Sequence, residues 1–368
     1  MSITPVRFNK SDRPEFYKDL NQRVNSYFKE NNISKKANFN MKCKTAFMVL
    51  LYFIPLGVVL SGLVTSFSGL IFNYVLMALG MSGIGLSIMH DANHGAYSNS
   101  KKINGALGYL INFIGGYHET WKIQHNVLHH SFTNIHGHDE DIDQNVMRLS
   151  PDQERKAIFK YQAYYATFFY GLLSLYRCFI KDTEQLFRYN RENLLSKKDH
   201  SFGYYLTELI ITKALYIFAV LILPIIVLDL PIYQIFISFF VMHYIAGLIL
   251  ALIFQPAHVL EETDFFVPNE NNTVENNWII HEMKTTANFA NGNRIFSWLI
   301  GGLNFQVEHH LFPHICHVHY RSIAGIVQST AAEYDVPYNH HPTYYGALKS
   351  HYSMLNKLGT GEYDRKRR

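Results

Sequence analysis

The sequence of 368 residues has little charge and few cysteines, and its first 40 residues contain no long apolar run. Charged residues make up 17% of it and the formal net charge is +4, with no dense stripe of Lys and Arg, so no nucleic-acid partner is expected. Cys43, Cys178 and Cys316 lie far apart and form no CxxC pair, which excludes a disulfide framework and zinc-finger spacing. No signal peptide is expected in the polar residues 1–40. These absences favour a reducing, cytosolic environment for the polar parts of the chain.

Two long stretches of the sequence are almost free of charge. Residues 45–89 carry none, and residues 214–255 carry only Asp229, which is close to Pro231. A membrane-spanning helix needs about 20 apolar residues, so each stretch is long enough for two helices and a tight turn. A buried soluble core can produce one such run, but two are typical of an integral membrane protein. We expect spans at about 45–64, 69–89, 214–228 and 232–254.

The positive charges predict the orientation of these spans. All 33 Lys and Arg residues lie outside the two stretches, with ten in residues 1–44, fourteen in 90–213 and nine in 256–368. Because positively charged segments stay on the cytosolic side, we expect both termini and the middle segment to be cytosolic.

Two further apolar pieces are expected to lie in the membrane interface and not to cross it. Residues 103–117 are too short to span, and residues 161–180 are rich in Tyr and carry Arg177. The chain is therefore expected to divide into a cytosolic N-terminal segment, a membrane domain and a C-terminal tail, at residues 1–44, 45–345 and 346–368.

Histidine is in surplus, with 20 residues, and several are crowded into three short motifs. These are HDANH at 90–94, HNVLHH at 125–130 and QVEHH at 306–310, and His258 follows the fourth expected span. Neutral imidazole is the commonest metal-binding side chain. A structural zinc site closes with about four ligands, so eight imidazoles favour two metals. The candidate ligands are His90, His94, His125, His129, His130, His258, His309 and His310.

Several polar side chains near the motifs are candidates to hold the imidazoles. Metal-binding histidines usually donate their second N–H to a carboxylate or carbonyl. The nearby acids are Asp91, Asp139, Asp141 and Glu308. Soluble di-iron bundles use Glu-x-x-His, which does not occur in this sequence, so nitrogen ligands are expected to dominate.

Gln306 precedes His309 and His310 by three and four residues, so on a helix it shares their face. Its amide oxygen is able either to ligate a metal weakly or to hydrogen-bond a water or histidine. Because eight imidazoles already supply four nitrogens per metal, the hydrogen-bonding role is expected.

Other histidines are expected to be ordinary polar residues. His243 falls within the fourth expected span and is assigned to packing. His281 and Glu282 begin like the zinc-protease signature HExxH, but Thr285 stands where the second His is required. The roles of five histidines near the motifs remain open, namely His136, His138, His314, His317 and His319.

The three histidine motifs resemble the histidine boxes of the membrane fatty acyl desaturases. The resemblance extends to WKIQHNVLHHSFTNIHGHDEDID at 121–143 and GGLNFQVEHHLFPHI at 301–315, and covers about residues 45–345. Gln306 stands in place of the first His of the third box. That replacement is similar to the front-end subgroup, which inserts a double bond between an existing one and the carboxyl end.

This resemblance implies a non-haem di-iron centre with the box histidines as ligands and His258 as an extra one. It implies dioxygen as oxidant, reduced to water, and two electrons from an external donor. The His-Pro-Gly-Gly motif of the haem domain fused to many front-end relatives is absent, so a separate ferredoxin or cytochrome is expected. The substrate would be a fatty acyl chain carried by CoA, a membrane lipid or acyl-carrier protein. Trp121, Trp298 and Asn304 are candidates to line its channel.

The expected fold is an all-α integral membrane protein with four transmembrane helices and a cytosolic, histidine-rich helical cap. The expected function is that of an acyl desaturase. A lipid hydroxylase with the same metal centre is a close alternative. A histidine-rich metal transporter is less well supported, because transporters place ionisable groups within the bilayer and only His243 lies in an expected span.

Overall fold

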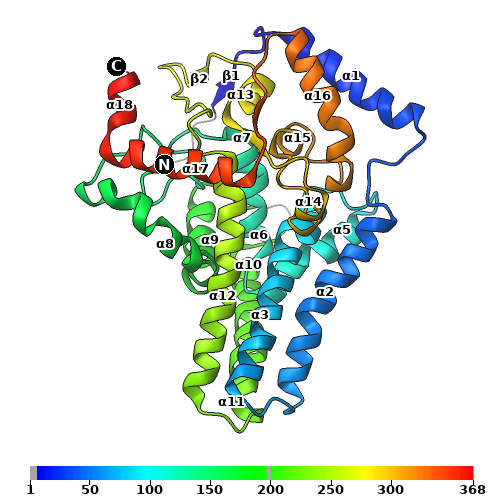
Figure 1. The fold of residues 1–368 in the computed structure, drawn as a ribbon, viewed down its shortest axis with the longest axis vertical. Coiled ribbons are helices and arrows are strands. Elements are labelled where there is room, and N and C mark those ends of the chain that lie inside the picture. The colour runs from blue at the N-terminus through cyan, green and yellow to red at the C-terminus, as the bar shows by residue number, and fades with distance from the viewer. Residues whose placement is uncertain (1–5, 197–199, 368) are drawn as a thin grey trace.

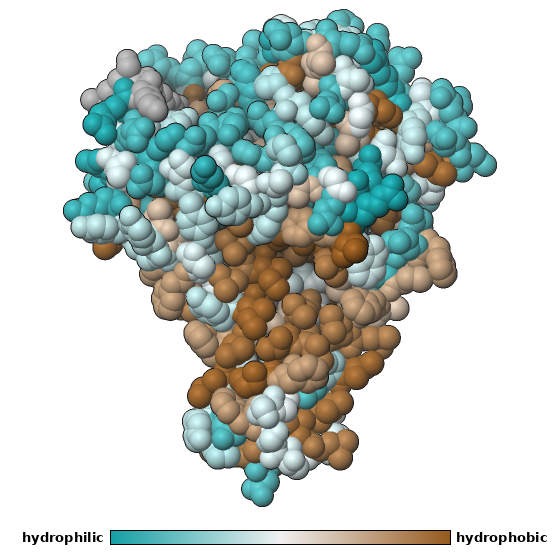
Figure 2. Space-filling view, in the orientation of Figure 1, coloured by the Kyte–Doolittle hydropathy of each residue, from teal (hydrophilic) through white to brown (hydrophobic). Residues whose placement is uncertain are grey.

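The computed structural model describes residues 6–196 and 200–367, and its regular secondary structure is almost entirely helical. Four long apolar helices form its narrow end (Figure 1). On the face shown in Figure 2, the surface over these helices is mostly hydrophobic, whereas the wide end is mostly hydrophilic. This division is that of a membrane protein, because a hydrocarbon-facing surface must be apolar. The four helices run through Phe39–Leu60, Phe67–Asn93, Phe202–Val227 and Ile232–Ala257.

Three of these long helices are composite. The first is α2 (Phe39–Leu60) alone. The second joins α3 (Phe67–Gly83), the π-helical turn η1 (Ile84–Ile88) and α4 (Met89–Asn93). The third joins α10 (Phe202–Ile217), the π-helical turn η6 (Phe218–Ile222) and α11 (Leu223–Val227). The fourth joins α12 (Ile232–Phe254) and the 3-10 turn η7 (Gln255–Ala257).

The third helix begins at Phe202, well before the expected position 214. The expected start relied on the charge of Lys213, but this lysine lies within the helix. Its ammonium donates to Asp182 Oδ2 at 2.6 Å and to the carbonyl of Gly115 at 2.7 Å. A lysine neutralised by protein partners does not need to leave the helix for water.

Local signals fix the ends of the long helices. The Asn38 and Ser66 side chains accept hydrogen bonds from the first turns of α2 and α3, and Pro231 immediately precedes α12.

Small residues determine how closely the long helices pack against one another. A Cβ on Gly80 of α3 would lie 2.6 Å from the backbone nitrogen of Tyr52 in α2, so only glycine permits this approach.

The other helices form the wide end and its junction with the long helices. Neither α8 nor the α5–η2 segment, which match the two expected interfacial pieces, is among the four candidate spans. The α-helices are α1 (Pro14–Glu30), α5 (Lys101–Gly108), α6 (His118–Lys122), α7 (His130–Phe132), α8 (Gln162–Tyr176), α9 (Asp182–Arg191), α13 (Trp278–Thr285), α14 (Arg294–Leu299), α15 (Gln306–Leu311), α16 (Tyr320–Glu333), α17 (Tyr344–Thr360) and α18 (Glu362–Arg367).

Shorter elements join them. The 3-10 turns are η2 (Tyr109–Ile114), η4 (Ala157–Tyr161) and η8 (His317–His319), and two more π-helical turns are η3 (Ile123–His129) and η5 (Arg177–Lys181). Strand β1 (Arg7–Phe8) pairs in parallel with β2 (Thr273–Val274), and β3 (Ala287–Phe289) pairs in parallel with β4 (Asn339–His341).

The wide end has a hydrophobic core of its own, apart from the membrane helices. In α1 every fourth residue is apolar and buried, through Phe16, Leu20, Val24 and Phe28. This stripe belongs to the same cluster as the buried side of α16. The core therefore holds α15 and its histidines from the side away from the membrane.

Candidate metal centre

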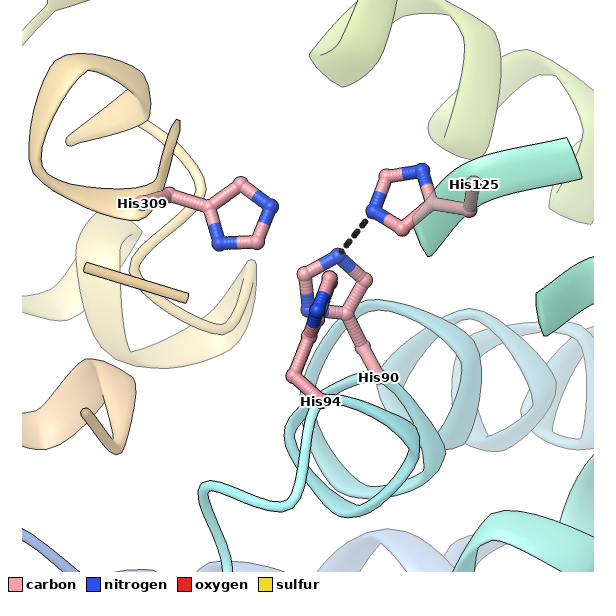
Figure 3. Close-up of side chains that lie close together, drawn as sticks. All are labelled: His90, His94, His125 and His309. Carbon is pink, nitrogen blue, oxygen red and sulfur yellow. Dashed lines mark hydrogen bonds between the residues drawn. The ribbon is translucent and has the colours of Figure 1, made fainter. Parts of the chain in front are cut away.

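Four separate segments bring the eight candidate histidines together at the junction of the wide and narrow ends. His90 is in α4 and His94 follows its last residue. The second motif occupies η3 and the start of α7, and the third lies in α15. His258 directly follows η7, at the end of the fourth long helix. Figure 3 shows four of them, from three of these segments, directed toward one another.

The π-helical turn η3 explains how the second motif brings two of its histidine rings together. In an α-helix, residues five apart do not share a face, whereas a π turn closes i to i+5. His125 and His130 are five apart, and their Nε2 atoms lie 3.2 Å from each other. The turn therefore directs both rings into the same space.

The histidines form two neighbouring sets. His90, His94, His125 and His309 each offer a ring nitrogen, and these nitrogens all lie within 4.8 Å of one another. The nitrogens of His129, His258 and His310 meet the same limit. His130 lies between the sets, since its Nε2 is 3.0 Å from His309 Nε2 and it also groups with His310.

Two histidines of the second set are held from behind by buried carboxylates. His129 Nδ1 lies 3.1 Å from Asp139, and His310 Nδ1 lies 2.7 Å from Glu282. Both acids are fully buried. A proton on Nδ1 shared with each acid leaves Nε2 with its lone pair directed toward the other histidines.

Two other histidines are held by neutral groups. His258 Nδ1 donates to the backbone carbonyl of Thr285 at 3.3 Å, and His309 Nδ1 lies 3.2 Å from the hydroxyl of Tyr320. These contacts fix the ring planes, and they again turn Nε2 inward.

The inward-facing atoms fit metal ligation. Among the described residues, the Nε2 atoms of His94, His129, His258 and His310 are buried and have no hydrogen-bond partner. A buried polar atom without a hydrogen-bond partner lowers the stability of the fold by about 1–3 kcal/mol. Four such atoms in one place are therefore rare in a protein core. A metal ion accepts several such lone pairs at once.

The protonation states also suit a metal. Burial, together with repulsion between the rings, lowers the pKa of most of these histidines well below its ordinary value, and neutral imidazole is the ligating form. His129 differs, because burial lowers its pKa but Asp139 outweighs that effect and raises it. The strongly lowered group comprises His94, His125, His130, His258, His309 and His310.

Three of the five expected supporting residues lie against the candidate histidines or line the cavity beside them. Asp139 contacts His129, and Asp141 Oδ2 lies 3.8 Å from His129 Nδ1. Gln306 is buried, and its Oε1 has no partner in the described chain.

Asp91 and Glu308 contact other groups and not the box histidines. Asp91 accepts from the Nδ1 of His317 at 2.9 Å, and Glu308 accepts from Asn288 and Tyr338. Each acid stands next to a candidate ligand in sequence, and on a helix adjacent residues face different directions, so neither contacts its neighbouring histidine.

Sequence reasoning missed Glu282, Thr285 and Tyr320. Glu282 was considered only as part of a failed protease signature, and its histidine partner is 28 residues away. No local spacing connects residues that far apart. His243, assigned to packing, has both ring nitrogens bonded, to Ser174 Oγ at 2.6 Å and Tyr216 hydroxyl at 2.8 Å.

A cavity of about 170 Å³ opens beside the first set of histidines. His90, His125 and His309 form part of its wall, together with Trp121. Much of the remaining wall is apolar, including Met81, Gly85, Ile111, Ile114 and Leu250. The cavity therefore offers a largely apolar space in direct contact with the candidate metal centre.

Trp298 and Asn304 are not part of this wall. Trp298 donates from its indole nitrogen to Asn40, and the Asn304 amide donates to Ser297 Oγ at 2.9 Å. Trp298 thus joins α14 to α2, and Asn304 bonds back to α14, so sequence proximity to the third motif did not predict their positions.

Comparison with known proteins decides the family. The fatty acid desaturase family matches residues 65–342, more than half of the chain. The chain belongs to the fatty acid desaturase family. This desaturase is thus an oxidoreductase, and the histidine motifs and four apolar helices are those of a membrane-bound member.

Curated relatives extend over nearly the whole desaturase. The sn-1 linoleoyl-lipid 6-desaturase of Synechocystis sp. is 34% identical over 366 residues, 97% of this chain and 99% of the relative. A protein of the same name from Arthrospira platensis is 35% identical, over 97% of this chain and 95% of the relative. The acyl-lipid (8-3)-desaturase of Physcomitrium patens is 33% identical over 97% of this chain and 74% of the relative. These three relatives are all named as desaturases, which favours desaturation over hydroxylation or metal transport.

Proposed function

We propose that this desaturase inserts a front-end double bond into an acyl chain of a membrane lipid, at a centre of two iron ions held by eight histidines. The relatives' names, which describe acyl-lipid desaturases, support a lipid-borne chain. The observation that carries the metal assignment is the set of four buried Nε2 atoms without partners, with three of their rings held from behind.

The proposed ligands divide as the structure groups them. The first ion would be held by His90, His94, His125 and His309, and the second by His129, His258 and His310. His130 lies between the sets and would complete the second. Gln306, whose Oε1 is buried without a partner, is proposed to accept a hydrogen bond at the centre and not to ligate iron.

Iron would supply the redox chemistry with dioxygen that breaks an unactivated C–H bond, which no acid or base side chain can do. The chain's own residues position the reactants. Trp121 and the apolar wall hold the acyl chain against His90, His125 and His309 and keep water out. Asp139, Glu282 and Tyr320 keep the ring planes fixed while electrons enter and leave.

We also propose that a ferredoxin or cytochrome delivers two electrons from the cytosolic side, where both termini and the histidine centre would lie. The positions of the Lys and Arg residues support this orientation. Purified iron-loaded protein given dioxygen and an acyl lipid is expected to turn over only after a ferredoxin or cytochrome system is added. Sustained turnover with NAD(P)H alone would overturn the proposal on electron supply.

Lipid profiling combined with metal analysis tests the proposal as a whole. A host that expresses the protein and is fed acyl precursors should accumulate a new unsaturated chain, and the purified protein should hold two irons. His310→Ala should lose both iron and product, whereas His243→Gln, which alters a histidine outside the centre, should keep its iron. One zinc per chain in the wild type would refute the metal assignment, and an unchanged lipid profile would refute the activity.

A further inference from the structure

A second cavity adjoins the one beside the histidines. Its volume is about 520 Å³, and it lies between the segment 137–149 and helices α8 and α9. The two cavities share five wall residues, so they meet at these side chains. These collar residues, which surround the junction, are Gln144, Leu173, Lys181, Ala251 and Gln255.

Lys181 of the collar is a buried cation without a hydrogen-bonded partner in the described chain. The residue is 8% exposed, and its one ion-pair contact is Asp141 Oδ1 at 4.0 Å from Nζ, too far for a hydrogen bond. Burial lowers the pKa of this ammonium, because removal from water disfavours the charged form. An oxygen acceptor placed at the collar would offset that cost.

The other two cations in the cavity walls are already engaged. Arg177 donates to Asp182 at 2.9 Å and to Gln124 at 2.6 Å, and Arg188 is paired with Glu140. Lys181 therefore has donors left for a ligand, at the point where the apolar cavity meets the polar one.

The charge of the second cavity indicates which carriers fit there. Its described wall contains four carboxylates, Glu140, Asp143, Glu184 and Glu192, against two cations, Lys181 and Arg188. A polyphosphate such as that of acyl-CoA would be repelled by this excess of negative charge. An uncharged or zwitterionic polar head is compatible with the carboxylates, amides and tyrosines that line it.

We propose that Lys181 binds the ester carbonyl of the substrate lipid at the collar, with the acyl chain in the first cavity and the polar head in the second. This inference rests on the proposed desaturase function and specifies how its substrate is held. Because the ester is fixed at the collar, the number of carbons between it and His90, His125 and His309 determines which bond is oxidised. Lys181 is thus a residue that sets the position of the double bond, counted from the carboxyl end.

Ligand binding tests the contact directly. The probes are dilinoleoyl glycerol, the core shared by glycerolipids, and its dialkyl ether analogue, which has the same chains and no carbonyl. The wild type should bind the ester about tenfold more tightly than the ether, as expected for a hydrogen bond to a charged group. Lys181→Met should bind the two equally, whereas Lys181→Arg should keep part of the preference. Lys160→Met, at an exposed lysine, is the matched control.

Product analysis provides a second measurement that a merely structural role would not change. In a host, Lys181→Met should yield double bonds at adjacent positions in place of one, with unchanged iron content per folded chain. A wild type that does not distinguish ester from ether, or a variant that keeps a single position, overturns the inference. If the wild type makes no unsaturated product at all, the proposed function fails instead, so the two failures are distinguishable.

Discussion

The carboxylate of Glu282 makes a sharp prediction, because it contacts one proposed ligand of one ion. Its Oε2 lies 2.7 Å from His310 Nδ1, and the described contacts connect it to no histidine of the first set. Loss of such an outer partner typically costs about 10–100-fold in metal affinity. Glu282→Gln keeps the shape of the side chain and one of its oxygens. We therefore expect the lower end of that range, a loss of metal affinity of about tenfold, or about 1.4 kcal/mol.

A chelator titration of the iron-loaded protein measures this effect. In Glu282→Gln, one iron per chain should be released at about one-tenth of the chelator concentration required by the wild type, while the other iron is retained as before. The same substitution at Glu308 is the matched control. Glu308 is equally buried, burial raises its pKa to about 7, and it bonds Asn288 and Tyr338. If both variants release iron alike, the contact with His310 has no special role and the reasoning is wrong.

Three further predictions follow from the same structure. Gln306→Leu should keep most of its iron but turn over poorly, whereas His309→Ala should lose iron, and equal iron loss by metal analysis would make Gln306 a ligand. Cysteines introduced at Ser66, in the turn after α2, and at Ser329, on α16, should react with impermeant thiol reagents from opposite sides of the membrane; labelling from one side would contradict the four spans. In the metal-free protein, histidines such as His258 have a lower pKa when folded than when unfolded, so the unfolded chain binds more protons below about pH 6.5. The free energy of unfolding should therefore decrease as the pH falls through that value, and a thermal-unfolding midpoint that does not change between pH 7 and pH 5.5 would disagree.

The number of membrane helices could be predicted because it depends on a local property. A stretch without charge is visible in the sequence, and the structure has four long apolar helices where such stretches occur. The start of the third was missed, because the partners that neutralise Lys213 come from Gly115 and Asp182, distant in sequence. Charge alone does not reveal whether a lysine has such partners.

In the candidate site, too, local patterns could be predicted from the sequence and contacts between distant residues could not. The histidine motifs were recognisable because each is a short local pattern, and their convergence followed from the order of the spans. The groups that hold the rings were harder to predict. Asp139 is ten residues from His129 and was expected, whereas Glu282 reaches His310 from a different helix. Tertiary packing places that contact, and no periodicity in a single sequence encodes it.

The π-helical turn in η3 has a consequence for how this enzyme tolerates insertions and deletions. Removing one residue from the turn, for example Val127, would restore α-helical pairing and improve the local backbone hydrogen bonding. His125 and His130 would then be four residues apart, and residues four apart on an α-helix share a face, so the pair would stay together. An α-helix formed without the deletion would instead carry His130 about 100° further round the helix axis, out of the space that it shares with His125. The segment therefore tolerates the loss of one residue better than it tolerates regular α-helical pairing at its present length.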